Sequence, residues 1–382
     1  MRFAVPVTAA LAACATDPTI ASQVDSAALR DYVAAQLSEH GVPGLQVAMV
    51  ASAGTLNELA AGVRVLGGEQ LQLDDRMHLG SCGKAMTSWL AALLVEDGAI
   101  RWQTTVGDAL PELARTTRAE HREITLEELL SHRSLLPPFT TAAAWSRLGE
   151  LSAIEPRARR HEFAAKVLAE PGVPFSAADV AAGFRYSNAG YAVAAAMLER
   201  ATGASWERLM AQRVFDPLGM AAVIGWPAAS GRNDEPRGHL ATVDPPGLEP
   251  HDPNDDYRID AVLAPAGDIS VSIRGYAAFL RQQLRGRRGL DPSRDAAFYR
   301  HLHHAIEFGS EYSLGWYWVD QFDDEVSSHT GSADTFYCSC IVLPGHDIAI
   351  AVVANAATDG AREAVTHVRN FLLRPYVSGS TR

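Results

Sequence analysis

The sequence predicts an α+β fold, an α/β sandwich whose antiparallel sheet is built from both ends of the chain and is flanked by helices. Strand patterns rich in β-branched residues occur at 45–66 and again at 313–355. The long stretch between them has mainly helical periodicity. Because the two strand regions are expected to share one sheet, the stretch between them is predicted to be an inserted, all-helical domain.

Domain boundaries follow from these patterns. A chain of 382 residues, 47% of them hydrophobic, can bury the core of one large domain or of two interleaved ones. The predicted segments are a leader and tether at 1–21, an α/β domain from 22–99 and 310–376, the helical insert at 100–309 and a tail at 377–382.

Individual elements are marked by their periodicity and their end signals. The helix that begins at Ser81 has a broad apolar stripe, which is typical of a helix at the centre of a domain. Two stretches at 230–237 and 247–260 are rich in Pro, Asp and Gly and are predicted surface loops. The main predicted helices lie at 22–40, 81–97, 188–202, 205–214 and 360–373, and the predicted strands at 45–51, 56–66, 77–79, 313–320, 326–330, 335–343 and 348–355.

The charge balance excludes several classes of partner. The net charge of −12 and the isoelectric point near 5.5 argue against a nucleic-acid ligand, whose phosphates require a basic surface. An acidic protein also has no attraction to anionic lipid headgroups. No run of 18 or more apolar residues is present, so no membrane-spanning helix is expected.

The N-terminus resembles a bacterial lipoprotein leader. Arg2 is a short positive region, residues 3–13 form an apolar region, and Leu11-Ala12-Ala13-Cys14 resembles a lipobox, in which the cysteine is lipidated. A cytosolic N-terminus rich in alanine and a cleaved soluble signal are the alternatives. We predict an exported bacterial protein of the periplasm or cell envelope, anchored to the membrane only through lipid on Cys14; a cytoplasmic protein is the alternative.

Metabolic labelling with a fatty acid tests the predicted leader. The wild-type protein is expected to carry the label and Cys14→Ser to lose it, because the thiol is the lipidation site. Unlabelled wild-type protein, or undiminished label on the variant, would contradict the prediction.

The other three cysteines form neither a metal nor a disulfide pattern. Cys338 and Cys340 lie two positions apart in a predicted strand and point to one face, which suits two packed thiols better than a bridge. Cys82 is expected to be a small buried residue. No spacing of Cys and His is typical of a metal site, so neither a metal ion nor another cofactor is predicted.

Ser81 and Lys84 form the first candidate catalytic pair. They are three positions apart at the start of a predicted helix, so their side chains share one face and can meet. The helix dipole and burial both lower the pKa of a lysine there, towards a neutral amine that can take a proton from a hydroxyl. The alternative is a helix cap at Ser81 and a surface lysine at position 84.

The scarcity of lysine strengthens the first interpretation. Lys84 and Lys166 are the only lysines among the 33 basic residues of the chain. Arginine cannot replace a lysine that must lose its proton, because the guanidinium group stays protonated in proteins. A lysine at position 84 is therefore consistent with a catalytic base.

Two further motifs extend the candidate site. Tyr186-Ser187-Asn188 stands at a predicted loop-to-helix junction, and His329-Thr330-Gly331-Ser332 on a predicted late strand. Taken singly, Tyr186 is more often a core aromatic residue, Asn188 a helix cap and His329 a solvent-facing residue. Together with Ser-x-x-Lys, and in this order, the motifs resemble the serine β-lactamase and penicillin-binding-protein superfamily, in particular its class C-type branch with its esterases and D,D-peptidases.

Other segments carry the resemblance over most of the chain. Residues 129–137, Leu-Leu-Ser-His-Arg-Ser-Leu-Leu-Pro, are similar to the family's Leu-Leu-Thr-His-Thr-Ser-Gly-Leu-Pro segment. Asp268 departs from the family's Pro-Ala-Gly-Gly loop and affects the predicted loop shape rather than the chemistry. The remaining similar segments are Phe215-Asp216-Pro217-Leu218-Gly219-Met220, Pro265-Ala266-Gly267 and Leu314-Gly315-Trp316.

The resemblance implies a role for each catalytic motif. Ser81 would be the nucleophile that forms an acyl-enzyme, and Lys84 would be its base. Tyr186 would be a second proton-transfer group, whose phenolate is favoured if Lys84 is cationic. Asn188 would orient Lys84 and contact the substrate amide.

The strand motif is expected to bind the substrate. The backbone N–H groups of Ser81 and Ser332 would form the oxyanion hole, beside Thr330 and Gly331. Many relatives have a lysine at the position of His329, where a fixed cation holds a substrate carboxylate. A histidine with an ordinary pKa near 6.5 attracts a carboxylate more weakly and in a pH-dependent way, which favours an esterase or amidase over a true β-lactamase.

The predicted function is a monomeric serine hydrolase that transfers an acyl group from an ester, amide or β-lactam carbonyl of a small molecule or peptide. One alternative is a D-Ala-D-Ala-type or D-amino acid peptidase of cell-wall metabolism, and another is a penicillin-binding sensor or scaffold without turnover. A Ser-His-Asp hydrolase fits poorly, because residues 79–83, Leu-Gly-Ser-Cys-Gly, lack the first glycine of a nucleophile elbow. A Cys82 nucleophile stays open, because a helix N-terminus lowers the pKa of a thiol.

Overall fold

The computed structural model describes residues 24–230, 234–244, 246–252, 258–304 and 310–377. Cys14 and the rest of the predicted leader lie outside these residues, so lipidation stays a prediction. Within the described ranges, no helix combines the length and the apolar character that crossing a membrane requires.

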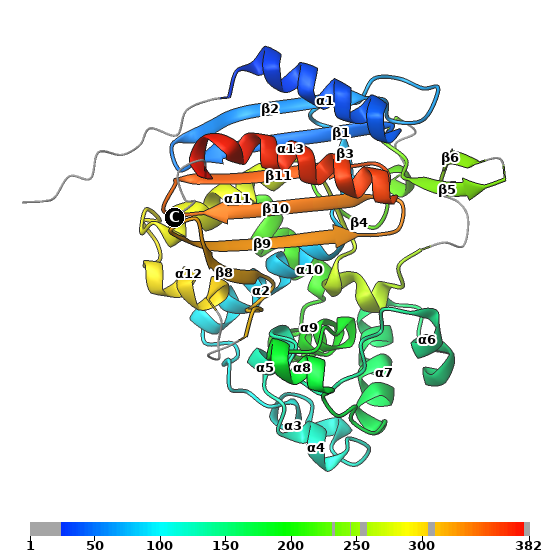
Figure 1. The fold of residues 1–382 in the computed structure, drawn as a ribbon. Coiled ribbons are helices and arrows are strands. Elements are labelled where there is room, and N and C mark those ends of the chain that lie inside the picture. The colour runs from blue at the N-terminus through cyan, green and yellow to red at the C-terminus, as the bar shows by residue number, and fades with distance from the viewer. Residues whose placement is uncertain (1–23, 231–233, 245, 253–257, 305–309, 378–382) are drawn as a thin grey trace, which may run out of the picture.

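Strands from both ends of the chain form one six-stranded antiparallel sheet, as predicted (Figure 1). The order is β2-β1-β11-β10-β9-β8, so the N-terminal and C-terminal strands meet where β1 pairs with β11. At this junction Leu45 lies opposite Ala354. The strands are β1 (Gly44–Ala51), β2 (Gly54–Gly62), β8 (Tyr317–Gln321), β9 (Asp324–Ser332), β10 (Tyr337–Leu343) and β11 (Ile348–Ala354).

Helices cover both faces of this sheet. The terminal helices α1 (Ser26–His40) and α13 (Asp359–Val377) pack against each other and against one face, as predicted (Figure 1). The helix α11 (Ile273–Arg287) packs against β1 and β11. Because side chains alternate along a strand, Val47 of β1 enters the core under the terminal helices and Ala48 the core on the other face.

The segment at 100–309 is not an all-helical insert, so this prediction is wrong. The helix α11 from this segment covers the sheet, because its apolar face matches the sheet's second face. Four short strands also occur there, and one of them overlaps the predicted loop at 247–260. They have only two to five residues each, too few to show a clear alternation, and the strand in the loop is rich in Pro and Gly. The short strands are β4 (Val223–Ile224), β5 (His239–Val243), β6 (Pro246–Pro250) and β7 (Ile269–Ser272), and β3 (Arg76–His78) pairs with β7.

Most of the other helices gather beside the sheet, below it in Figure 1. The helix α9 (Asn188–Thr202) has the predicted bounds and is buried along most of its length, with α5 and α7 packed against it. The remaining helices are α2 (Lys84–Glu96), α3 (Val106–Ala109), α4 (Ala119–Arg122), α5 (Leu126–Leu130), α6 (Ala142–Leu148), α7 (Pro156–Ala169), α8 (Ala177–Ala182), α10 (Trp206–Met210) and α12 (Ala296–His303).

Candidate active site

Ser81 lies in the turn that joins β3 to α2. The Leu79 N–H donates to Ile269 O at 2.9 Å, and the chain then tightens into a 3-10 turn, η1 (Gly80–Gly83), before α2 begins at Lys84. The predicted helix at 81–97 is therefore a 3-10 turn followed by an α-helix. This geometry leaves the Ser81 side chain half-buried at the wall of a cavity.

Close backbone contacts fix this turn and require glycine. Gly80 has a φ of +52°, and a Cβ there would lie 2.5 Å from the Ser332 nitrogen. A Cβ on Gly331 would lie 2.0 Å from Leu79 O and 2.8 Å from the Ser81 nitrogen. The end of β9 therefore runs directly beside the Ser81 turn, which brings together the backbone segments that carry the Ser81 and Ser332 nitrogens.

Lys84 is fully buried, and its amine has three oxygen partners. The Nζ atom lies 3.2 Å from Ser81 Oγ, 2.8 Å from Asn188 Oδ1 and 2.5 Å from Ala266 O. Burial lowers the pKa of Lys84 well below its ordinary value, which favours the neutral amine. The two side chains of the Ser-x-x-Lys pair thus meet as their spacing predicts, whereas the Ala266 carbonyl is a partner that the sequence did not identify.

Asn188 connects Lys84 to the wall of the cavity. It is the first residue of α9, and Ser187 is the helix cap, with its hydroxyl accepting from the Gly190 N–H at 3.2 Å. The Asn188 Oδ1 accepts from Lys84, and its Nδ2 donates to Phe139 O at 3.1 Å. These two bonds fix which end of the amide faces the lysine.

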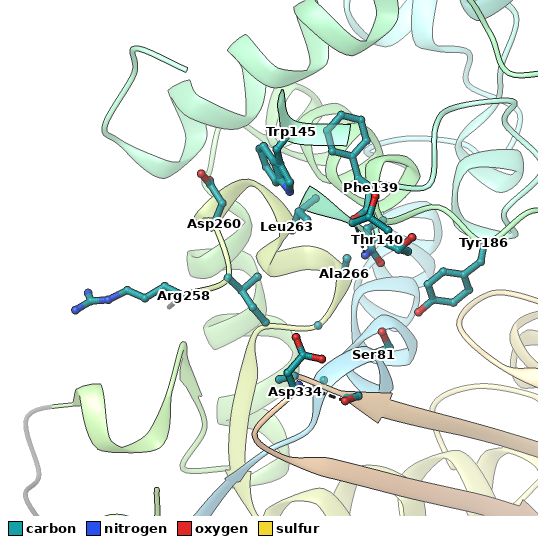
Figure 2. A pocket seen from close by; sticks show the side chains of 17 residues that line it. Ser81, Phe139, Thr140, Trp145, Tyr186, Arg258, Asp260, Leu263, Ala266 and Asp334 are labelled. Carbon is teal, nitrogen blue, oxygen red and sulfur yellow. Dashed lines mark hydrogen bonds between the residues drawn. The ribbon is translucent and has the colours of Figure 1, made fainter. Parts of the chain in front are cut away.

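Tyr186 points its hydroxyl toward Ser81 (Figure 2). The Lys84 Nζ lies 4.7 Å from the centre of the Tyr186 ring. Burial raises the pKa of Tyr186 well above its ordinary value, although a hydrogen bond with Ser81 acts in the opposite direction. The condition set for a phenolate, a cationic Lys84, is therefore not favoured, because burial shifts both pKa values toward a neutral amine beside a protonated phenol.

His132 packs against Tyr186 and is a site residue that was not predicted from the sequence. It is fully buried, its ring centre lies 4.3 Å from that of Tyr186, and its Nδ1 accepts from the Ser187 N–H at 3.1 Å. Burial lowers the pKa of His132 well below its ordinary value, so the ring stays neutral. The resemblance of residues 129–137 to a family segment is the signal that could have identified it.

His329 does not occupy the substrate-facing position predicted for it. It is 2% exposed, its Nδ1–H donates to Thr330 O at 2.6 Å, and its Nε2 accepts from the Tyr312 hydroxyl at 3.1 Å. Burial, together with nearby Lys84, lowers the pKa of His329 to about 3. The expected pKa near 6.5 and the pH-dependent carboxylate contact are wrong, because β9 turns this side chain into the protein.

A cavity of about 680 Å³ opens beside Ser81 (Figure 2). Among the described residues of the strand motif, Ser332 lines the cavity, whereas His329, Thr330 and Gly331 do not. Most of the other lining residues belong to loops or short turns, whose shape periodicity does not predict. The lining residues that the sequence did not identify include Phe139, Thr140, Thr141, Trp145, Arg258, Ile259, Asp260, Leu263, Ala333 and Asp334.

Three buried thiols lie close to the Ser81 turn. Cys82 Sγ lies 3.6 Å from His329 O and 3.9 Å from Cys338 O, and Cys340 Sγ lies 3.6 Å from His329 O. The predicted packing of free thiols is confirmed. Burial raises the pKa of the Cys82 thiol, which argues against Cys82 as the nucleophile. Among the residues with a described placement, no cluster of three His, Cys, Asp or Glu side chains could hold a metal ion.

Comparison with known proteins identifies the family. The Beta-lactamase family model matches residues 29–373. The chain belongs to the beta-lactamase family. This confirms the resemblance drawn from the three motifs and supports a general hydrolase function, because hydrolases are among the chain's relatives in this family.

Individual members of the beta-lactamase family match at low identity over much of the chain. Penicillin-binding protein 4 of Amycolatopsis lactamdurans is 27% identical over 332 residues, which cover 83% of this chain and 82% of that protein. Lovastatin esterase of Penicillium rubens is 30% identical over 238 residues, which cover 56% of this chain and 54% of that protein. D-amino acid amidase from Ochrobactrum anthropi, solved with L-phenylalanine amide, has the same fold, with a TM-score of 0.65, 20% identity and coverage of 91% and 99% of the two chains.

Proposed function

We propose that this chain is a serine hydrolase that cleaves an ester or an amide through an acyl-enzyme on Ser81. The observation that carries the proposal is the buried Lys84 amine, 3.2 Å from Ser81 Oγ and held by oxygen acceptors from two other segments. Because burial favours the neutral amine, Lys84 can accept the hydroxyl proton as the serine attacks.

In the proposed acylation, Lys84 Nζ takes the proton from Ser81 Oγ while Oγ bonds to the substrate carbonyl carbon. The carbonyl oxygen becomes negative and accepts from the N–H groups of Ser81 and Ser332; one such donor typically contributes about 2.7–4 kcal/mol. The carbonyl then re-forms as the bond to the leaving group breaks. The leaving group takes the Tyr186 hydroxyl proton, and the phenolate regains a proton from Lys84.

Deacylation reverses these proton transfers with water as the nucleophile. Water gives one proton to Lys84 as its oxygen bonds to the acyl carbon. The bond to Ser81 Oγ then breaks, Oγ takes the proton back from Lys84, and the carboxylic acid leaves. Each cycle thus consumes one water and restores the resting protonation state of the site.

Neutral esters are favoured over substrates that carry a carboxylate beside the carbonyl. His329 is buried and uncharged at neutral pH, so it offers no cation at the position where many relatives have lysine. Asp334 also lines the cavity, and its backbone N–H donates to Ser332 Oγ at 3.2 Å. The Asp334 carboxylate would repel a carboxylate on the substrate. Arg258 lines the cavity as well, but points away from Ser81 (Figure 2).

A D-amino acid amidase or peptidase is the second candidate. Asp334 lines the cavity, and a carboxylate attracts the free ammonium group of an amino acid amide or a peptide. Asp260 lines the cavity as well, but its carboxylate is paired with Arg159, whose Nη2 lies 2.6 Å from Oδ2. The names of penicillin-binding protein 4 and of D-amino acid amidase among the similar proteins support this alternative.

A substrate panel distinguishes these activities. It contains nitrophenyl esters, a chromogenic cephalosporin, a D-Ala-D-Ala peptide and D-phenylalanine amide, with Ser81→Ala as the control protein. We expect the highest kcat/KM for the neutral esters. Release of D-Ala or ammonia at a higher kcat/KM would support the second candidate instead, and a persistent adduct on Ser81 without turnover would indicate a penicillin-binding sensor or scaffold.

Tyr186→Phe tests the proposed proton donor. Loss of the hydroxyl is expected to lower kcat for alkyl esters by about 10²- to 10⁴-fold, because their leaving groups need a proton. The loss for nitrophenyl esters should be much smaller, because nitrophenolate leaves without protonation. Equal losses for both ester types in steady-state assays would contradict a role in leaving-group protonation.

We also propose that the mature protein is exported and anchored through lipid on Cys14. This part of the proposal is supported by the leader sequence alone, and the labelling experiment described above tests it.

A further inference from the structure

A buried histidine and a buried aspartate that the proposed mechanism does not use lie behind the Ser81 turn. His78 is the last residue of β3 and is fully buried, and Asp268 precedes β7 and is 7% exposed. The rings of Trp226 and Phe336 lie beside His78, with centroid distances of 4.7 and 6.2 Å. Burying a polar side chain costs free energy unless the side chain is hydrogen-bonded. The hydrogen bonds of this pair are therefore the feature to explain.

The hydrogen bonds of His78 determine its tautomer. Its Nδ1 lies 3.0 Å from the Gly80 nitrogen, and its Nε2 lies 2.9 Å from Asp268 Oδ1. A backbone N–H can only donate, so Nδ1 is the acceptor and the ring is neutral with its proton on Nε2. The Asp268 carboxylate accepts the hydrogen bond from this Nε2–H. It therefore stabilises the tautomer whose Nδ1 can accept from the Gly80 N–H.

Gly80 is held on three sides. Its N–H donates to His78, a Cβ on it would lie 2.5 Å from the Ser332 nitrogen, and a Cβ on Gly267 would lie 2.4 Å from Gly80 O. The next peptide unit carries the Ser81 N–H, the expected oxyanion donor. Because the Gly80 dihedral angles set the direction of that N–H, a shift of the Gly80 amide would turn the donor away from the substrate oxygen.

Asp268 also belongs to the segment that holds the lysine. It follows Gly267 and Ala266 directly, and Ala266 O accepts from Lys84 Nζ at 2.5 Å. The Asp268 N–H donates to Ala264 O at 3.0 Å, which fixes the carboxylate relative to this segment. The bonds from Asp268 through His78 to Gly80 therefore connect the segment behind the base to the turn that carries the nucleophile.

We propose that His78 and Asp268 are positioning residues that set the alignment of the Ser81 turn relative to Lys84. Asp268 holds the His78 tautomer, and His78 holds the Gly80 amide. The inference rests on the proposed acyl transfer by Ser81 and adds to it a pair of residues that never touches the substrate. It also explains the aspartate at the place where the family's loop pattern has a second glycine.

Two substitutions of Asp268 separate positioning from simple stability. Asp268→Ala removes the acceptor of the His78 Nε2–H. We expect kcat for the best ester to fall about 10- to 100-fold with little change in KM, because a small displacement of the reacting groups has an effect of this size. Asp268→Asn keeps an oxygen acceptor and is expected to restore kcat close to the wild-type value.

Asp324→Ala is the matched control. Asp324 is also 7% exposed and also contacts a histidine, with its Oδ2 3.1 Å from His346 Nδ1, at the β8–β9 hairpin. Its replacement is expected to lower the thermal midpoint without lowering kcat of the folded protein. Where Asp268→Ala does not fold, His78→Asn, whose Oδ1 can still accept from Gly80, is compared with His78→Leu.

Nitrogen NMR of histidine-labelled protein reads the tautomer directly and needs no substrate. The His78 signals are assigned by their absence from the spectrum of His78→Asn. In the wild type they should show hydrogen on Nε2 only, and in Asp268→Ala the population should shift toward the Nδ1–H tautomer. Hydrogen on Nδ1 in the wild type, wild-type kcat in folded Asp268→Ala, or equal losses in the alanine and asparagine variants would overturn the proposal. Activity that survives Ser81→Ala would instead overturn the proposed function and leave the tautomer result standing.

Discussion

Ser81→Ala is expected to lower kcat for the best ester by about 10⁴-fold or more, because the variant lacks the oxygen that bonds to the acyl group. Steady-state hydrolysis measures this loss. Mass spectrometry after a short exposure to a slowly hydrolysed ester should show the acyl mass on the wild-type protein and not on the variant. The variant is expected to fold, because Ser81 is half-buried at a cavity wall and its replacement leaves no internal void.

A serine remote from the cavity is the control for this result. Ser293 is exposed, and Ser293→Ala should keep both wild-type kcat and the acyl adduct. An adduct on the Ser81→Ala protein with undiminished turnover would assign the chemistry to another residue.

Lys84→Arg is expected to lower kcat by about 10²- to 10⁴-fold, the usual contribution of a general base. The guanidinium group stays protonated and cannot take the Ser81 proton, although it keeps a donor for nearby oxygens. The matched control is Lys166→Arg, the same substitution at the other lysine of the chain, whose side chain is 35% exposed. Wild-type activity in Lys84→Arg would show that the base is another group.

The pH profile provides a second test of Lys84. Only the neutral amine can accept a proton, and its pKa lies well below the ordinary 10.5 because the group is buried. The kcat/KM of the wild type should therefore rise with pH and reach its plateau well below pH 10.5, and fall as acid protonates the amine. Lys84→Arg should retain no such rise in its residual activity, measured with a nitrophenyl ester.

The central strands and the long helix of the site could be predicted because each is a continuous apolar run bounded by turn or cap residues. Helix α9 and strands β10 and β11 are long and apolar, and the predicted bounds agree within two residues with the observed ones. The helix α11 was misplaced for a different reason. Periodicity predicts that a helix has an apolar face, but not which layer of the protein that face covers.

The candidate site was predictable where chemistry depends on spacing between side chains. Ser81 and Lys84 meet because they are one helical turn apart. The Ala266 carbonyl could not be identified in this way, because every residue has a carbonyl and only the fold selects one. His329 was placed wrongly because a strand motif does not tell which of its residues turn into the protein, and here the imidazole binds Tyr312.

The pairing of β1 with β11 has a consequence for when the protein becomes active during its synthesis. Until Ala354 has emerged from the ribosome, β11 cannot pair with β1, and Leu45 has no partner on that side of its strand. Ser332, beside the Ser81 turn, also emerges late, whereas Ser81 emerges early. Contacts between such distant parts of a chain form slowly. The proposed site around Ser81 is therefore complete only after the last strands of the sheet have been synthesised and paired.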